Sequence, residues 1–276
     1  MAGSDKPQTF YEVLTDAVND LTENGYSSEE QLEGWLAKLR AAAYRSLTPT
    51  YVLEAELRNL LTTTYKRLVE KGGIFRYHPG VEKFTLAKVK PKLRAELDRR
   101  ILASANLIKL NRTEAIETTL RRFSGWSTSI PPGGTEATKK VQTKTDIRKS
   151  LSQLSFVERR VAIDQGHKFV ANLNDILAED GGAIAAEWHS HWRQGNYNYR
   201  KDHKERDEKV YLIRGNWASQ QGLVRASRDG YFDEITKPAE EVYCRCFATY
   251  IYSPRRLPRD MLTDRGAEKF GLREAA

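Results

Sequence analysis

The first half of the chain repeats its apolar residues at helical spacing. A first helix is predicted from residues spaced three or four apart and followed by Asn24-Gly25: Phe10, Val13, Leu14, Ala17, Val18 and Leu21. Ser27 and Glu30 form a capping-box pattern that opens a second helix. A third is predicted to begin at Thr48-Pro49, where proline is tolerated, and to end at Gly72-Gly73.

The pattern changes between residues 74 and 86. Aromatic residues surround Pro79-Gly80 here, which predicts a turn or short hairpin. Helical spacing returns from Pro91, with Leu93, Leu97 and Ile101 on one face. Asn111 and Glu114 then predict a new cap, which would open a short helix that reaches residue 123.

Residues 124–138, SGWSTSIPPGGTEAT, interrupt the helical pattern. Pro131-Pro132 and Gly133-Gly134 disfavour regular structure for several positions. We therefore predict three parts: a helical region over 1–123, an exposed linker over 124–138, and a second domain over 139–276.

The last part begins as helix and continues as strand. A long helix or helix pair is predicted from 139 to 179, ended by Gly181-Gly182. Short runs rich in β-branched and aromatic residues follow at 183–188, 210–213 and 242–252. They predict a small mixed or antiparallel sheet carried on the preceding helix, so the expected fold class is α+β.

Composition excludes several classes of protein. Hydrophobic residues make up 39% and charged residues 30%, as in ordinary globular proteins. No apolar run approaches the roughly 18–20 residues of a membrane span, and the start MAGSDKPQTF does not resemble a secretory signal. Cys244 and Cys246 are the two cysteines, and in strand geometry their side chains would not form a disulfide, so we expect no disulfide framework.

The positive charge is concentrated in one segment. Residues 83–122 contain 11 Lys or Arg against 4 Asp or Glu, a net +7 in a chain whose formal net charge is +8. Such a segment predicts a nucleic-acid partner, although a solvated helix face would have the same composition. The side chains predicted to contact DNA are Lys88, Lys90, Lys92, Arg99 and Arg100.

Potential metal ligands gather near the C-terminus. In the string WHSHW, His189 and His191 are two residues apart, which places them on one face of a strand. His203, Cys244 and Cys246 follow along the chain. Together these five residues predict either a tetrahedral zinc site or, alternatively, packed thiols with surface histidines.

Other constellations are less complete. Asp202-His203 and Asn216 resemble part of a metal-dependent nuclease site, but no histidine follows Asn216. Glu240-Glu241 would suit an ADP-ribosyltransferase-like catalyst, yet neighbours in a strand point to opposite faces and no nicotinamide-binding motif is present. No P-loop, nucleophile elbow or dinucleotide fingerprint occurs. We therefore predict no catalytic residues.

The order of the C-terminal residues is more specific than any single one. Trp188 follows a long helix, an R-x-x-H pattern comes next, and a Cys-Arg-Cys string ends the region. This order resembles the head morphogenesis family of tailed phages, the Mu F-like minor head proteins, over residues 159–252. Here Arg160-Val161-Ala162 stands in place of the family's Arg-Thr-Glu, and Tyr243 in place of its Asn. The signature residues are Trp188, Arg200, His203, Pro238, Cys244, Arg245 and Cys246.

The resemblance implies a structural minor head protein and no enzyme. Such a protein would be present in few copies, would contact the portal and capsid proteins, and would lie near packaged double-stranded DNA. Region 1–123 would then be a docking region, and the protein would be found in the phage head and, during assembly, in the host cytoplasm. No membrane anchor or small-molecule substrate is expected. The alternative function is a metal-dependent, nuclease-like enzyme acting on nucleic acid.

Overall fold

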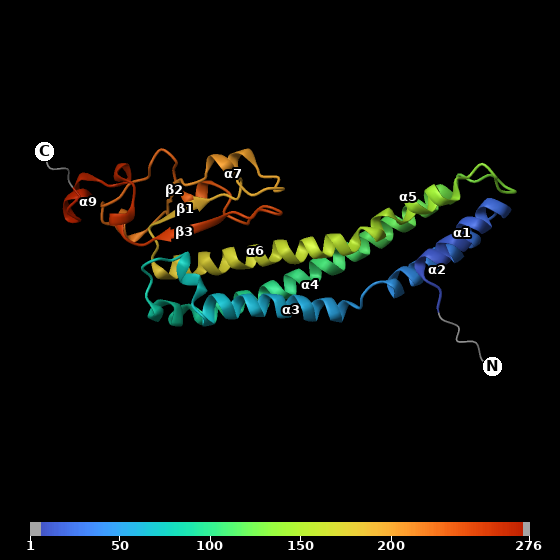
Figure 1. Ribbon diagram of the computed structural model, residues 1–276, viewed down its shortest axis with the longest axis horizontal. Helices are drawn as coiled ribbons and strands as arrows, with labels where there is room; N and C mark the ends of the chain where they lie inside the picture. The colour runs from blue at the N-terminus through green and yellow to red at the C-terminus, as the bar shows by residue number, and fades with distance from the viewer. Residues whose placement is uncertain (1–6, 273–276) are drawn as a thin grey trace. The chain divides into compact units, whose positions relative to one another are not determined.

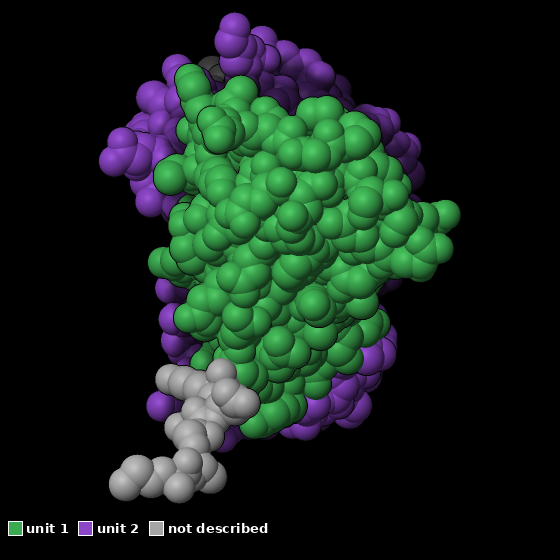
Figure 2. Space-filling view, turned by 90° about the vertical axis from the view of Figure 1, so that its right-hand side faces the viewer, with its two compact units in different colours: residues 1–56, 105–161 green, residues 57–104, 162–276 purple. Residues whose placement is uncertain are grey.

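The computed structural model describes residues 7–272, which form two compact units (Figures 1 and 2). Unit 1 comprises the chain up to Glu56 together with Ala105–Val161. Unit 2 comprises Leu57–Ser104 and the chain from Ala162 onward. This grouping differs from the predicted division at 124–138, a segment that lies inside unit 1. The first six residues of the segment considered as a secretory signal lie outside the described residues.

Unit 1 is built from helices. Its elements are α1 (Phe10–Asn24), α2 (Glu29–Ser46), the start of α3 (Thr50–Tyr65), the later part of α4 (Lys83–Ser127), α5 (Lys140–Ser152) and the start of α6 (Leu154–Gly181). The Thr9 side chain accepts the Glu12 N–H while the Glu12 carboxylate accepts the Thr9 N–H, so a capping box opens α1. Ser28, one residue after the predicted position, caps α2. The three predicted helices are confirmed.

Apolar faces of α1, α2, α4 and α5 meet in the core of unit 1. Its fully buried side chains include Leu14, Leu21, Leu39 and Phe123. Burial of each such side chain contributes about 1.5–3 kcal/mol, so these helices depend on one another for stability. The spacing seen in the sequence therefore identifies the buried face correctly.

The segment predicted as an exposed linker is anchored at several points. Helix α4 extends to Ser127, and Ile130 is buried. Gly25 and Gly134 both have left-handed φ angles, and a Cβ on either would meet backbone atoms of the other segment at less than 3 Å. The Thr135 N–H donates to the Thr22 carbonyl at 2.8 Å. Glycine thus allows this loop to pack closely on the end of α1. Most residues of 124–138 are nevertheless exposed.

Helix α4 is one continuous helix that starts earlier and ends later than the two helices predicted for this region. It begins at Lys83, passes through Pro91 and continues across Asn111, so the predicted helix start at Pro91 and the predicted cap at Asn111 are wrong, whereas the turn predicted around Pro79-Gly80 is present. The preceding segment contains a π-helix (Lys66–Glu70) that continues α3 and a 3-10 turn (Gly73–Arg76). Leu86, Val89 and Leu93 form a buried stripe across Pro91. This packing outweighs the local cost of a proline in a helix.

Unit 2 contains a three-stranded antiparallel sheet among the described residues. Strand β1 (Ala185–His189) lies between β2 (Val210–Leu212) and β3 (Phe247–Ile251), as Figure 1 shows. Ala186 pairs with both Tyr211 and Tyr250. The α+β class is confirmed, and so are the strands, except that the third begins at residue 247 and not at 242.

Both faces of the sheet are covered. One face packs Trp188 and Tyr250 with the two cysteines and with Ala178 of α6. The other packs Ile184 and Leu212 with Leu223, Leu257 and Met261. The remaining short elements are α7 (Lys201–Glu205), α8 (Trp217–Gln220), α9 (Asp264–Lys269) and 3-10 turns at Phe232–Glu234, Pro254–Arg256 and Arg259–Met261. No helix of the described residues combines the length and apolar character needed to cross a membrane.

Candidate functional site

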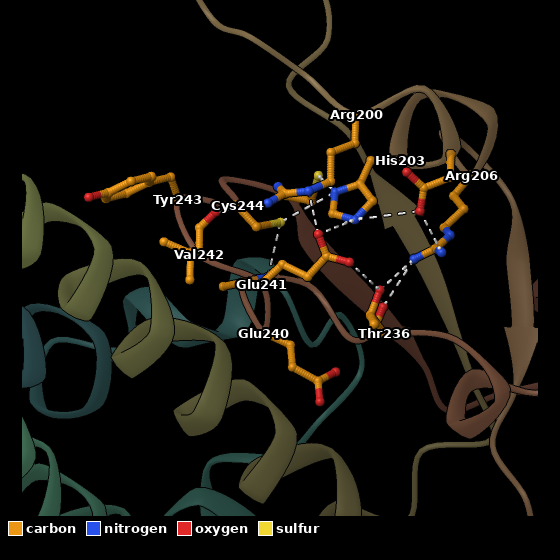
Figure 3. Close-up of polar contacts among 12 residues, drawn as sticks. Arg200, His203, Arg206, Thr236, Glu240, Glu241, Val242, Tyr243 and Cys244 are labelled. Carbon is orange, nitrogen blue, oxygen red and sulfur yellow. Dashed lines mark hydrogen bonds and ion pairs between the residues drawn. The ribbon is translucent and has the colours of Figure 1, made fainter.

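His203 lies at the centre of a buried cluster in unit 2 (Figure 3). His203 belongs to α7, and this helix begins directly after Arg200, whose backbone is extended. The Trp188 ring meets the His203 ring edge-on, with centroids 5.2 Å apart. The tryptophan of β1 therefore fixes the plane in which the imidazole presents its two nitrogen atoms.

The two cysteines approach one nitrogen of this imidazole. The Sγ atoms of Cys244 and Cys246 each lie 3.5 Å from His203 Nδ1. Both residues precede β3, so the strand geometry assumed for them does not apply, and both thiols are free and buried. Tyr243, just before them, has a left-handed φ of 62°. That local bend of the backbone accompanies thiols that face a common point.

The other nitrogen of His203 faces carboxylates. Its Nε2 atom is buried without a hydrogen-bond partner, while Glu241 Oε2 lies 3.8 Å away and Asp202 Oδ2 lies 3.9 Å away. Arg200 forms an ion pair with Glu241 and donates to the Val242 carbonyl at 3.0 Å. Arg206 bonds Asp202 at 2.8 Å. Two arginines thus hold the two carboxylates beside the imidazole (Figure 3).

The thiols influence each other electrostatically. The pKa of Cys244 is lowered, chiefly because the Cys246 thiol donates a hydrogen bond to it, with the Ala239 N–H as a further donor at 3.3 Å. The pKa of Cys246 is raised by that same bond and by burial. One thiolate is therefore favoured before the second.

The predicted five-ligand set is divided by the structure. His203, Cys244 and Cys246 place one nitrogen and two sulfur atoms within 4.8 Å of one another. His189 instead stacks on Phe247, with ring centroids 4.8 Å apart, and His191 lies against the same ring. Neither belongs to the group, because β1 ends at His189 and the two histidines do not continue a strand together.

The two other signature residues flank the cluster. Pro238 is buried, and the Arg245 guanidinium lies over the Tyr197 ring, 5.3 Å from its centroid. Both line an open cavity of about 440 Å³ that also borders Cys246 and His191. Burial and the nearby Arg245 charge lower the pKa of His191. The seven signature residues therefore lie around one region of unit 2.

The predicted DNA-binding side chains do not form a uniform set. Arg100 is buried and donates to Gln165 Oε1 at 3.0 Å, so it is not exposed to contact DNA as predicted. Lys92 pairs with Asp180 and Arg99 with Glu96. Lys88 and Lys90 are exposed and form no ion pair among the described residues. Of the five predicted DNA contacts, these two are therefore the side chains without an ion pair or buried partner among the described residues.

The residues of the alternative sites are engaged in local structure. Asn216 caps α8 by accepting the Ser219 N–H at 2.9 Å and donates to the Ile213 carbonyl at 2.6 Å. Glu240 and Glu241 lie in turns and not on a strand, so the argument from strand geometry does not apply to them. The Glu240 carboxylate accepts the Lys237 N–H at 2.6 Å. Of Asn216, Glu240 and Glu241, only Glu241 approaches His203.

Sequence reasoning missed a second buried polar network in unit 2. His78 is fully buried, donates from Nε2 to Asn174 Oδ1 at 3.0 Å and accepts the Tyr252 hydroxyl at 2.7 Å. Its ring stacks on Tyr250, with centroids 4.9 Å apart. Burial lowers the pKa of His78 to about 4. No local sequence pattern indicates that His78 is buried. In contrast, the i,i+4 spacing of Asp202 and Arg206 indicates the ion pair beside His203.

Comparison with known proteins adds no relative. No family model, no curated protein and no solved structure matches the chain.

Proposed function

We propose that the chain is a structural protein of a tailed-phage head, of the Mu F-like head morphogenesis class. In this proposal it is not an enzyme. It joins the portal or inner capsid during assembly in the host cytoplasm, remains in the virion and lies near packaged double-stranded DNA. Its partners are portal and capsid proteins, and it has no small-molecule substrate.

One observation carries the proposal: the signature residues are dispersed over 59 positions of sequence, from 188 to 246, yet five of them belong to the cluster around one imidazole, and Pro238 and Arg245 line the adjoining cavity. Their contacts join β1, α7 and the segment before β3. Arg200 binds the chain beside Cys244, and Trp188 packs on His203. Contacts that join separate segments of the chain support a motif that holds a lobe together, as an assembly protein requires.

The enzyme alternative is less well supported by the same region. In a nuclease-like site, a histidine must reach a water or a substrate phosphate. His203 is buried, with only 1% of its surface exposed, and both its nitrogens face protein groups. Asn216, the other polar residue of that alternative, is used as a helix cap. These contacts favour a structural role for the region.

Particle composition tests the proposal directly. Heads would be assembled in cells that express this chain together with phage portal and capsid proteins, then purified and quantified by mass spectrometry. We expect a few copies per DNA-filled head. Absence from the heads, together with cleavage of DNA by the isolated protein that a chelator abolishes, would establish the enzyme instead.

A pair of variants refines this test. His203→Ala removes the centre of the cluster, so we expect it to lower the melting temperature and the yield of filled heads together. Glu240→Gln, in the neighbouring turn but outside the cluster, serves as the matched control and should leave both unchanged. A His203→Ala protein that keeps its melting temperature and assembles normally would contradict a structural role for the cluster.

A further inference from the structure

The cluster around His203 has the dimensions of a tetrahedral metal site. Zinc binds imidazole nitrogen at about 2.0–2.1 Å and thiolate sulfur at about 2.3 Å. At a tetrahedral angle these lengths place the nitrogen and each sulfur about 3.6 Å apart. The two observed Nδ1-to-Sγ distances are both 3.5 Å. The two distances therefore fit one ion bound among the three atoms, which all lie within 4.8 Å of one another.

Hydrogen bonding alone explains this arrangement less well. Imidazole Nδ1 offers either one proton or one lone pair, directed in the plane of the ring. It can therefore make one strong bond, yet two sulfur atoms lie at the same distance from it. A shared cation between the three atoms accounts for the equal distances. Residues from α7 and from the segment before β3 would then bind the same ion.

The surroundings also match those of a metal-bound histidine. Such a histidine usually presents its second ring N–H to a carboxylate, which orients the ring. Here Nε2 is buried without a hydrogen bond, and Glu241 Oε2 is the nearest carboxylate oxygen, at 3.8 Å. Arg200 fixes Glu241 in place. On the other side, the Ala239 N–H donates to Cys244 Sγ at 3.3 Å, as expected beside a thiolate.

We propose that His203 Nδ1, Cys244 Sγ and Cys246 Sγ bind one Zn²⁺ ion, with Glu241 as the carboxylate that positions His203. Two thiolates and an imidazole favour zinc over magnesium or calcium, which prefer oxygen ligands. Both sulfurs bind as thiolates, so binding releases to solvent any thiol proton still present. These three residues supply three ligands, so a water molecule or a group from another molecule completes the fourth position.

This site rests on its own contacts and does not depend on a role in a phage head. It joins the segment after β1 to the segment before β3, which lie about forty residues apart in sequence. Metal binding is measured on the isolated chain, so its failure and the failure of the proposed function are distinguishable.

The first experiment uses the whole wild-type chain, purified under reducing conditions. Elemental analysis is expected to find one zinc per chain. After removal of zinc, titration with Co²⁺ should give thiolate-to-cobalt charge-transfer bands that saturate at one equivalent and disappear when Zn²⁺ is added. A chain that is folded, reduced and zinc-free as purified, and that gives no such bands, overturns the proposal.

Variants then assign the ligands. Cys244→Ser and Cys246→Ser should each lose the bands of the wild-type site, and full retention by either one removes that residue from the site. If these variants do not fold, the zinc affinities of Glu241→Gln and of the control Glu240→Gln are compared instead. Competition with a chromogenic chelator should show zinc affinity 10–100-fold weaker in Glu241→Gln only. Equal affinities in the two variants overturn the positioning role of Glu241.

Discussion

The two units reach stability by different means. Unit 1 joins amphipathic helices through a contiguous apolar cluster that includes Leu14, Leu39 and Phe123. The sheet of unit 2 has small residues at its centre, Ala185 and Ala186, and surrounds them with buried polar groups such as His78 and His203. An apolar core needs only the right volume, whereas a buried polar network needs each partner in place. The comparison predicts different responses to mutation and to pH.

The largest effect is expected in the core of unit 1. Phe123→Ala should lower the free energy of unfolding by about 3–5 kcal/mol, because it leaves a cavity among side chains that cannot fully collapse. Leu110→Ala on the same helix is the control, since 66% of that side chain is exposed and the expected change stays within about 0.5 kcal/mol. Urea denaturation followed by circular dichroism measures both. Similar losses for the two variants would contradict the assignment of the core.

The next effect concerns pH and belongs to unit 2. The pKa of His78 falls from 6.5 to about 4 on folding, so the unfolded chain binds more protons between these values. The stabilisation is therefore complete above pH 6.5 and is lost as the pH falls toward 4, by roughly 3 kcal/mol. Urea unfolding at several pH values measures the free energy of unfolding. Between pH 6.5 and 4 this free energy should fall by about 3 kcal/mol less in His78→Gln than in the wild type. Parallel curves for wild type and variant would show that His78 does not titrate as proposed.

DNA binding offers a third contrast between the units. Lys88→Gln with Lys90→Gln should reduce the slope of log affinity against log salt by about 2, since each neutralised phosphate contributes close to one. The control replaces Lys139 and Lys149, two exposed lysines of unit 1, in the same way. Fluorescence anisotropy with duplexes of unrelated sequence gives the slopes. Equal changes in both double variants would favour a merely solvated basic face.

The smallest effect is expected at Tyr243. Its left-handed backbone disfavours a bulky L-residue, and asparagine adopts that conformation more readily. Tyr243→Asn should therefore raise the free energy of unfolding by roughly 0.5–1 kcal/mol, because it relieves backbone strain. The hydrogen bond from the Tyr243 N–H to Asp164 Oδ1, 2.6 Å long, belongs to the backbone and is retained in the variant. Denaturant titration would detect the gain. A clear loss instead would indicate that the tyrosine side chain contributes more than the backbone strain costs.

The sequence alone determined where most helices and strands form. Apolar spacing located the helices of unit 1, and β-branched runs located the three strands, because both periodicities are local consequences of backbone geometry. Local signals failed where packing opposed them. Pro91 and Asn111 predicted helix boundaries, yet α4 continues through both, since a buried stripe on its face stabilises more than either residue costs.

Only the tertiary structure decided which polar residues meet. His189, His191 and His203 were equal candidates in the sequence, and the end of β1 together with the fold of α7 brings only His203 to the cysteines. Arg100 could not be distinguished from Arg99 by composition, yet one is buried against Gln165 and the other is exposed. Periodicity specifies the face on which a side chain lies, but the distance between side chains of different elements depends on how those elements pack.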